Sequence, residues 1–130
     1  MQPLYAILIV FMLFIFACDT TPICRDILGS WTDGEGQEIL FLENGTALWL
    51  TRFGSQSDTI HFAYQLLCKK VPGTLDWSNF SNGPYAGRTL YGIIEWLSDS
   101  TFQFRYEPGY QPDVRPKEFD TVQTLRFMKN

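Results

Sequence analysis

From Ile27 onward, apolar and polar residues alternate over short stretches, and turn residues interrupt the alternation at short intervals. The clearest case is Phe102, Phe104 and Tyr106, which alternate with polar residues and so share one face of a strand. No stretch has the period of about 3.6 residues that marks an amphipathic helix. The pattern predicts eight strands, at residues 27–32, 37–43, 46–52, 59–70, 74–80, 88–96, 101–106 and 119–128.

Turn chemistry between these strands favours hairpins. Asn44-Gly45 is a strong signal for a two-residue hairpin turn, and Gly34 and Gly36 supply positive φ angles in another turn. Short antiparallel strands in sequence form a meander, and closing it into a barrel removes both exposed edges. We therefore expect an all-β fold, an antiparallel up-and-down eight-stranded barrel in one domain at residues 27–130, with a β-sandwich as the alternative.

An uncharged apolar run precedes this domain, at residues 4–17. It is shorter than the about 20 residues that cross a bilayer, and its length is typical of the apolar core of a secretory signal. The run ends in Ile15-Phe16-Ala17-Cys18, which resembles a bacterial lipobox. The resemblance implies that residues 1–17 are a signal peptide and that Cys18 is the lipidated first residue of the mature chain.

These expectations place the protein in the cell envelope, lipid-anchored and facing outside the cytoplasm, with residues 18–26 as a tether. Three alternatives stay open. Cleavage near Ala17 gives a soluble secreted protein, an uncleaved run gives a short anchor, and a run that stays with the domain gives a buried N-terminal element.

The formal net charge is −4, and every charged side chain lies from Asp19 onward. A mildly acidic domain lacks the basic stripe that nucleic-acid binding needs, so no nucleic-acid partner is expected. The same charge argues against electrostatic docking on anionic lipid, which leaves the lipid anchor as the expected membrane contact.

The chain has three cysteines. If Cys18 carries lipid, Cys24 and Cys68 remain as a pair, and such a pair oxidises outside the cytoplasm. We expect a Cys24–Cys68 disulfide, with two buried free thiols as the alternative. Neither cysteine has a second Cys or a His at the close spacing of a zinc site.

No residue set indicates a reaction. His61 is the only histidine, and the sequence offers it neither a nucleophile nor an orienting partner. Glu95 and Asp99 fit an ordinary strand and turn better than an acid–base pair, and the acidic residues at 33–38 fit a solvated turn better than a calcium site. We expect no enzymatic activity, no metal and no cofactor.

Aromatic residues occupy many strand positions. An eight-stranded barrel is close to the size at which side chains either fill the interior or leave room for one small ligand. The first reading makes these residues the core, and the second makes them an apolar pocket. The residues expected to line such a pocket are Tyr64, Trp77, Leu90, Trp96, Phe102 and Phe104.

Gly29-Ser30-Trp31 resembles the Gly-x-Trp opening of lipocalin-like proteins. A second, longer resemblance covers nearly all of residues 27–129 and is to a family of small bacterial lipocalin-like domains of uncharacterised function. Its motifs include Pro72-Gly73-Thr74-Leu75-Asp76 and Arg115-Pro116-Lys117-Glu118-Phe119. The resemblance implies a barrel and often an exported setting, and it implies no activity because a fold does not determine function.

The lipocalin resemblance also implies structural roles. It implies that Trp31 closes the base of the barrel and that Arg126 stacks on it as a cation–π partner. Arg115 and Pro116 suit a loop that re-enters the sheet, because proline fixes φ and withholds a hydrogen-bond donor. Arg115 then braces that loop or binds a carboxylate.

The sequence therefore favours a membrane-anchored, non-catalytic binding module that holds a small apolar ligand in its barrel. The alternative is a filled barrel that acts through its outer surface, as a structural protein or as an inhibitor of another envelope protein.

Overall fold

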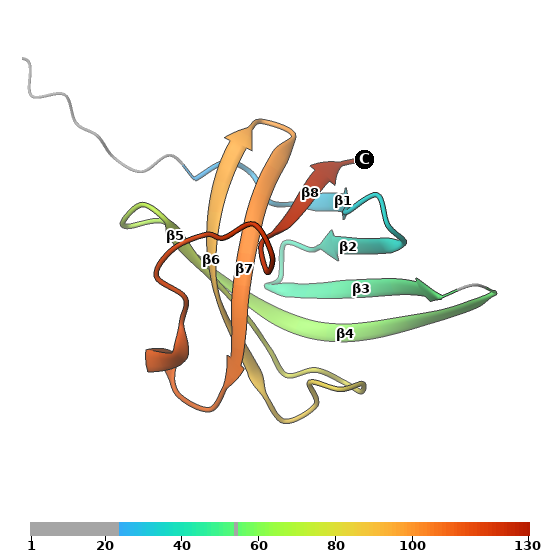
Figure 1. Cartoon of the computed structure of the whole chain (residues 1–130). Coiled ribbons are helices and arrows are strands. Elements are labelled where there is room, and N and C mark those ends of the chain that lie inside the picture. Colours follow the sequence, from blue (N-terminus) through green and yellow to red (C-terminus); the bar gives the residue numbers. More distant parts are fainter. Residues whose placement is uncertain (1–23, 54) are drawn as a thin grey trace, which may run out of the picture.

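The computed structural model describes residues 24–53 and 55–130, which form a closed barrel of eight antiparallel strands in an up-and-down order. Each strand pairs with the next one along the chain, and β1 pairs with β8 to close the ring (Figure 1). The all-β barrel prediction is confirmed, and the sandwich alternative is wrong. The strands are β1 Gly29–Thr32, β2 Gln37–Phe41, β3 Thr46–Phe53, β4 Gln56–Leu67, β5 Gly73–Ser78, β6 Thr89–Ser98, β7 Thr101–Gly109 and β8 Leu125–Lys129.

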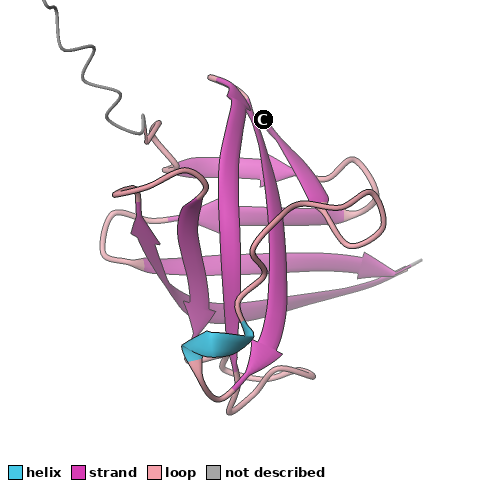
Figure 2. Cartoon of the chain, turned by 60° about the vertical axis from the view of Figure 1, so that its left-hand side comes forward, coloured by secondary structure: helices cyan, strands magenta, loops and turns pink. Residues whose placement is uncertain are grey.

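The up-and-down order divides the links between strands into two groups. The chain enters β1 at one end of the barrel, which also carries the links β2–β3, β4–β5 and β6–β7; we call it the tether end. The opposite end carries the links β1–β2, β3–β4, β5–β6 and β7–β8, and we call it the mouth. Figure 2 shows the short 3-10 helix η1, Pro112–Val114, in the β7–β8 link. No helix in the described residues is long and apolar enough to span a membrane.

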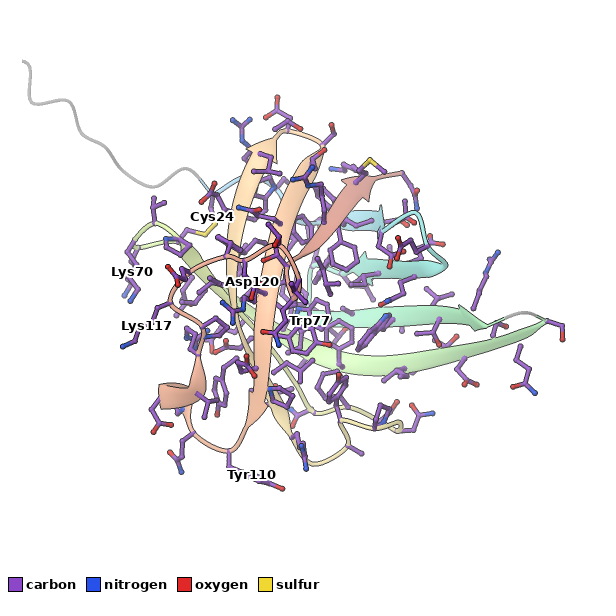
Figure 3. All side chains as sticks on the ribbon, viewed as in Figure 1. Cys24, Lys70, Trp77, Tyr110, Lys117 and Asp120 are labelled. Carbon is purple, nitrogen blue, oxygen red and sulfur yellow. A yellow bond between two sulfur atoms is a disulfide. The ribbon has the colours of Figure 1, made fainter. Side chains whose placement is uncertain are left out.

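Inward-facing apolar side chains fill the barrel. Trp31, Trp77 and Phe104 have no exposed surface, and Figure 3 shows Trp77 among the other side chains near the middle of the barrel. The buried aromatics contact one another along the interior, so they form one continuous core. The buried residues of this core are Ile27, Trp31, Ile39, Phe41, Ala47, Trp49, Ile60, Phe62, Leu75, Trp77, Phe80, Leu90, Ile94, Phe102, Phe104 and Phe127.

The predicted disulfide between Cys24 and Cys68 is confirmed, with 5.6 Å between the Cα atoms. It joins the segment that enters β1 to the start of the β4–β5 link, so it lies at the tether end. By chain-entropy estimates a loop of this length contributes about 4 kcal/mol to stability. The predicted signal peptide at residues 1–17 and the lipidation site Cys18 lie outside the described residues.

The last strand begins six residues later than predicted. Residues 119–124 alternate weakly, but Asp120 takes them out of the sheet. Its carboxylate accepts hydrogen bonds from the backbone N–H groups of Gln123, at 2.6 Å, and Val122, at 3.1 Å. Such local bonds compete with strand pairing. The Gln123 bond, together with nearby Arg105, holds the pKa of Asp120 below its ordinary value.

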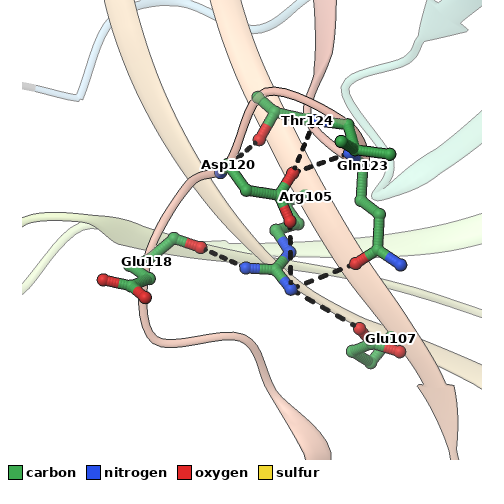
Figure 4. Close-up of polar contacts among 7 residues, drawn as sticks. Arg105, Glu107, Glu118, Asp120, Gln123 and Thr124 are labelled. Atoms are coloured by element: carbon green, nitrogen blue, oxygen red, sulfur yellow. Dashed lines mark hydrogen bonds and ion pairs between the residues drawn. The ribbon is translucent and has the colours of Figure 1, made fainter.

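Arg105, on the outer face of β7, fastens this turn to the barrel (Figure 4). Its guanidinium donates to the Glu118 carbonyl at 2.7 Å and to Gln123 Oε1 at 3.1 Å, and it lies 3.4 Å from the Asp120 carboxylate. Sequence alternation also ended β7 too early, because Glu107 still pairs with β6.

Candidate functional site

The mouth holds an open cavity of about 430 Å³. Its walls come from the mouth ends of β2, β3, β4, β7 and β8 and from the β5–β6 link, which the up-and-down order brings together. The size is within the range of small-molecule sites, about 300–1,000 Å³. The lining residues are Gln37, Trp49, Thr51, Asp58, Ile60, Asn82, Gly83, Pro84, Tyr85, Tyr106 and Leu125.

Three aromatic rings make the apolar wall of the cavity. Trp49 and Tyr85 lie almost parallel, with ring centroids 6.2 Å apart and an angle of 7° between the planes. Tyr106 meets Tyr85 edge to face at 5.9 Å, and their hydroxyl oxygens are 3.0 Å apart. The Trp49 indole N–H donates to Gln37 Oε1 at 3.1 Å, which fixes the ring against β2. The wall is therefore held by hydrogen bonds as well as by packing.

Tyr106 remains a neutral phenol. Burial, and then the hydrogen bond to the Tyr85 hydroxyl, raise the pKa of Tyr106 well above its ordinary value. The pair thus presents hydroxyl groups rather than a phenolate. A smaller pocket of about 290 Å³ shares both tyrosines with the cavity and extends past them to Glu107.

The polar side of the cavity is acidic. Asp58 on β4 stands opposite Thr51 on β3 in the ladder, and partners in an antiparallel ladder project to the same side of the sheet. Thr51 lines the cavity, so Asp58 projects inward as well. Asp58 forms no ion pair within residues 24–53 and 55–130, and no Lys, Arg or His lines the cavity.

The six residues predicted to line a ligand pocket do not line this cavity. Trp77, Leu90, Phe102 and Phe104 are fully buried and pack on other side chains, as in the stack of Trp77 on Phe104 at 4.6 Å. The alternation identified them as inward-facing, but their rings fill the barrel instead of surrounding a space. These four residues therefore belong to the packed interior, and the open cavity lies at the mouth instead.

The other two of the six lie toward the tether end. The Tyr64 hydroxyl donates to the carbonyl of Leu42 at 2.7 Å, next to the β2–β3 link. Trp96 lines a pocket of about 200 Å³ beside the disulfide.

Sequence reasoning missed most of the mouth residues. Trp49 falls within the predicted strand at residues 46–52, but nothing local shows that it borders open space. Tyr85 lies in the β5–β6 link and Asp58 in a region expected to be a polar loop, so neither belonged to a predicted strand face. The signal that could have identified the mouth is the inward-facing carboxylate of Asp58. Recognising that Asp58 faces inward requires the register of β3 and β4.

The predicted partner of Trp31 is corrected. Lys129 Nζ, not Arg126, lies over the Trp31 ring, 5.6 Å from its centroid. Phe127 points into the barrel, so Arg126 beside it points outward and is exposed, whereas Lys129 shares the inward face. The Trp31 indole N–H donates to the carbonyl of Ile27 at 2.8 Å, and Gly29 has a φ of 103°.

Arg115 binds a carboxylate of its own chain. Its guanidinium holds Asp76 through two hydrogen bonds, of 2.5 and 2.9 Å, and donates to the carbonyl of Gly92 at 2.7 Å. These bonds join the β7–β8 link to β5 and β6, and the adjacent Pro116 is buried. Arg115 therefore braces the loop.

The residues considered for catalysis or metal binding do not meet. His61 is exposed on β4, and its neighbour in the ladder is Leu48. Within the described part of the chain, no three His, Cys, Asp or Glu residues are grouped so that they could hold a metal ion. Comparison of the chain with protein-family models, with curated proteins and with solved structures finds no match, so the function is argued from the site itself.

Proposed function

We propose that this protein is a binding module that works outside the cytoplasm, anchored to a membrane through Cys18, and that its ligand site is the cavity at the barrel mouth. The observation that carries the proposal is the cavity of about 430 Å³ with an aromatic wall and a few polar groups. Apolar pockets with a few placed polar groups are typical small-molecule sites.

The rest of the barrel supports a site at the mouth. The packed core below Trp49 makes a rigid floor, because Trp49 contacts the fully buried Trp77 with ring centroids 5.5 Å apart. A preformed wall loses little freedom when a ligand enters, which favours binding.

The described chain begins at the tether end of the barrel, and the proposed site lies at the opposite end. The Cys24–Cys68 disulfide fixes the entering chain at the tether end, whereas the cavity opens at the mouth. An anchor at Cys18 is close in sequence to the tether end and not to the mouth, which supports a mouth that a ligand in the surrounding compartment can reach.

Two further observations support a location outside the cytoplasm. A structural disulfide is stable in oxidising compartments and rare in the cytosol. The lipobox-like Ile15-Phe16-Ala17-Cys18 precedes the disulfide at the spacing of a short tether. The resemblance to exported lipocalin-like domains agrees with both.

Native mass spectrometry of the mature protein, taken from its own membranes in nonionic detergent, tests the ligand site. We expect a bound small molecule that is lost in Thr51→Phe, because the phenyl ring occupies the cavity. Arg126→Met, at an exposed position on β8, is the control that keeps the ligand. Repeated absence of any bound molecule in the wild type contradicts the proposal.

The intact mass from the same preparation tests the anchor. A chain that starts at Cys18 with diacylglyceryl and acyl groups, two hydrogens light, is the expected result. A lipid-free chain, or one that keeps Met1, refutes the anchor.

The filled core favours a second candidate, a barrel that acts through its outer surface. Buried apolar side chains, many of them aromatic, pack against one another in the interior. This candidate predicts a protein partner that is retained equally by the wild type and by Thr51→Phe.

A further inference from the structure

We propose that the mouth cavity selects an organic cation, a protonated amine or quaternary ammonium carried on a small apolar or aromatic body. The inference rests on the proposed function and specifies the ligand class of the same site. It follows from an unpaired inward carboxylate, a wall of electron-rich rings and the charges of the lining residues.

Asp58 supplies the carboxylate. The inward positions that follow it on β4 are apolar, with Ile60 and Phe62 both buried, so a charged residue departs from the pattern at the mouth. The ladder partner of Asp58 is Thr51, which is 9% exposed and carries a neutral hydroxyl group. No basic side chain from β2, β3, β7, β8 or the β5–β6 link lines the cavity to neutralise this charge. Asp58 is exposed, so water solvates its carboxylate, and a cationic ligand in the cavity gives it a counter-charge.

The aromatic wall favours the same charge. Trp49, Tyr85 and Tyr106 line the cavity as neighbours of one another, and the faces of such rings carry partial negative charge. Cations bind to these faces, and recognition of quaternary ammonium groups by aromatic residues is a common use of this attraction. Because Tyr106 stays neutral, its ring and hydroxyl contribute without adding an ionised group.

The surroundings of the cavity disfavour anions. Glu107 lines the smaller pocket on the far side of the two tyrosines, so a second carboxylate lies close to the site. The Glu107 carboxylate is 3.9 Å from the Arg105 guanidinium. That guanidinium also donates a hydrogen bond to the Glu118 carbonyl in the β7–β8 link. The cavity lining therefore offers carboxylates and phosphates no cationic partner, and it gives a neutral ligand no electrostatic advantage.

The experiment is isothermal titration of the mature protein in nonionic detergent with three benzyl compounds of similar size. These are benzylammonium, benzyl alcohol and phenylacetate, which are cationic, neutral and anionic. We expect the cation to bind at least tenfold more tightly than the alcohol, and phenylacetate to bind weakest. Raising the ionic strength should weaken cation binding and leave the alcohol unchanged, because salt screens exposed charges.

Two variants assign the effect to Asp58. Asp58→Asn should weaken binding of the cation about tenfold and leave the alcohol unchanged. Glu43→Gln, which removes an exposed carboxylate in the β2–β3 link at the other end of the barrel, should change neither. The preference of the wild type for the cation is measured without any variant, so the inference stays testable if Asp58→Asn does not fold.

The outcomes separate the two proposals. Equal binding of the cation and the alcohol, abolished for both by Thr51→Phe, refutes the cation and leaves the mouth site standing. Tight binding of the cation that Thr51→Phe does not change refutes the mouth as the site. Failure of the cation to bind refutes the cationic ligand class, and the native mass measurement then decides whether the mouth holds another ligand.

Discussion

Replacing Arg115 by methionine removes the brace between the β7–β8 link and the barrel while keeping the length of the side chain. The variant loses two hydrogen bonds to Asp76 and one to the carbonyl of Gly92. The side chains of Arg115 and Asp76 are 19% and 22% exposed, so the pair is mostly but not fully withdrawn from water.

The expected loss lies between two limits. Breaking a buried ion pair costs about 3–5 kcal/mol because one charge stays uncompensated, whereas an exposed pair contributes about 0–1 kcal/mol. For a bidentate pair about four-fifths buried we expect a loss of about 3 kcal/mol from the free energy of unfolding. In a domain of this size that corresponds to a fall of about 10–15 °C in Tm.

Urea denaturation without reductant measures this loss, with Arg126→Met as the matched control. Arg126 is an exposed arginine on β8, so its replacement should change the free energy of unfolding by less than about 0.5 kcal/mol. A double-mutant cycle with Asp76→Asn should return a coupling of about 2 kcal/mol, because each single variant already removes the same pair. Equal effects of Arg115→Met and Arg126→Met, or a coupling near zero, would show that the reasoning is wrong.

Three further predictions follow from the fold. Gly92→Ala should destabilise the barrel by about 3 kcal/mol in chemical denaturation, because a Cβ there lies 2.6 Å from a backbone oxygen of β5; a loss below about 1 kcal/mol contradicts this. Reducing the Cys24–Cys68 disulfide should lower the free energy of unfolding by about 4 kcal/mol, and an unchanged urea midpoint after complete reduction counts against it. The hydrogen bond from the Gln123 N–H lowers the pKa of Asp120 in the folded state. The stability that the ionised Asp120 carboxylate contributes is therefore fully present above its ordinary pKa of 3.8, and it is lost as the pH falls through the folded-state pKa. Asp120→Asn should flatten the stability curve in that acid range, and a curve parallel to that of the wild type rules this out.

Local patterns were enough to predict the strands and their order. Alternation with a period of two places Phe102 and Phe104 on one face whatever the rest of the chain does, and Asn44-Gly45 favours a tight hairpin through its own backbone preferences. Closure into a barrel then follows from the need to pair both edge strands. The Cys24–Cys68 pair could be predicted because the expected role of Cys18 as a lipidation site left two other cysteines.

The local pattern was insufficient where a competing contact decided the outcome. The Asp120 carboxylate takes the backbone N–H groups of the following turn, so the last strand starts at Leu125. Lys129 rather than Arg126 covers Trp31 because the register of β8 puts Phe127 inward, which fixes the direction of its neighbours.

By itself the sequence determined which side chains share one face of a predicted strand, because that depends only on the strand period. Which of those side chains fill the barrel and which surround a space depended on the tertiary structure. Trp77 and Phe104 stack on each other in the interior, whereas Trp49, Asp58 and Tyr85 line the cavity at the mouth. Those distances depend on the closure of the ring, the register of β3 and β4 and the path of the β5–β6 link, and no local pattern contains them.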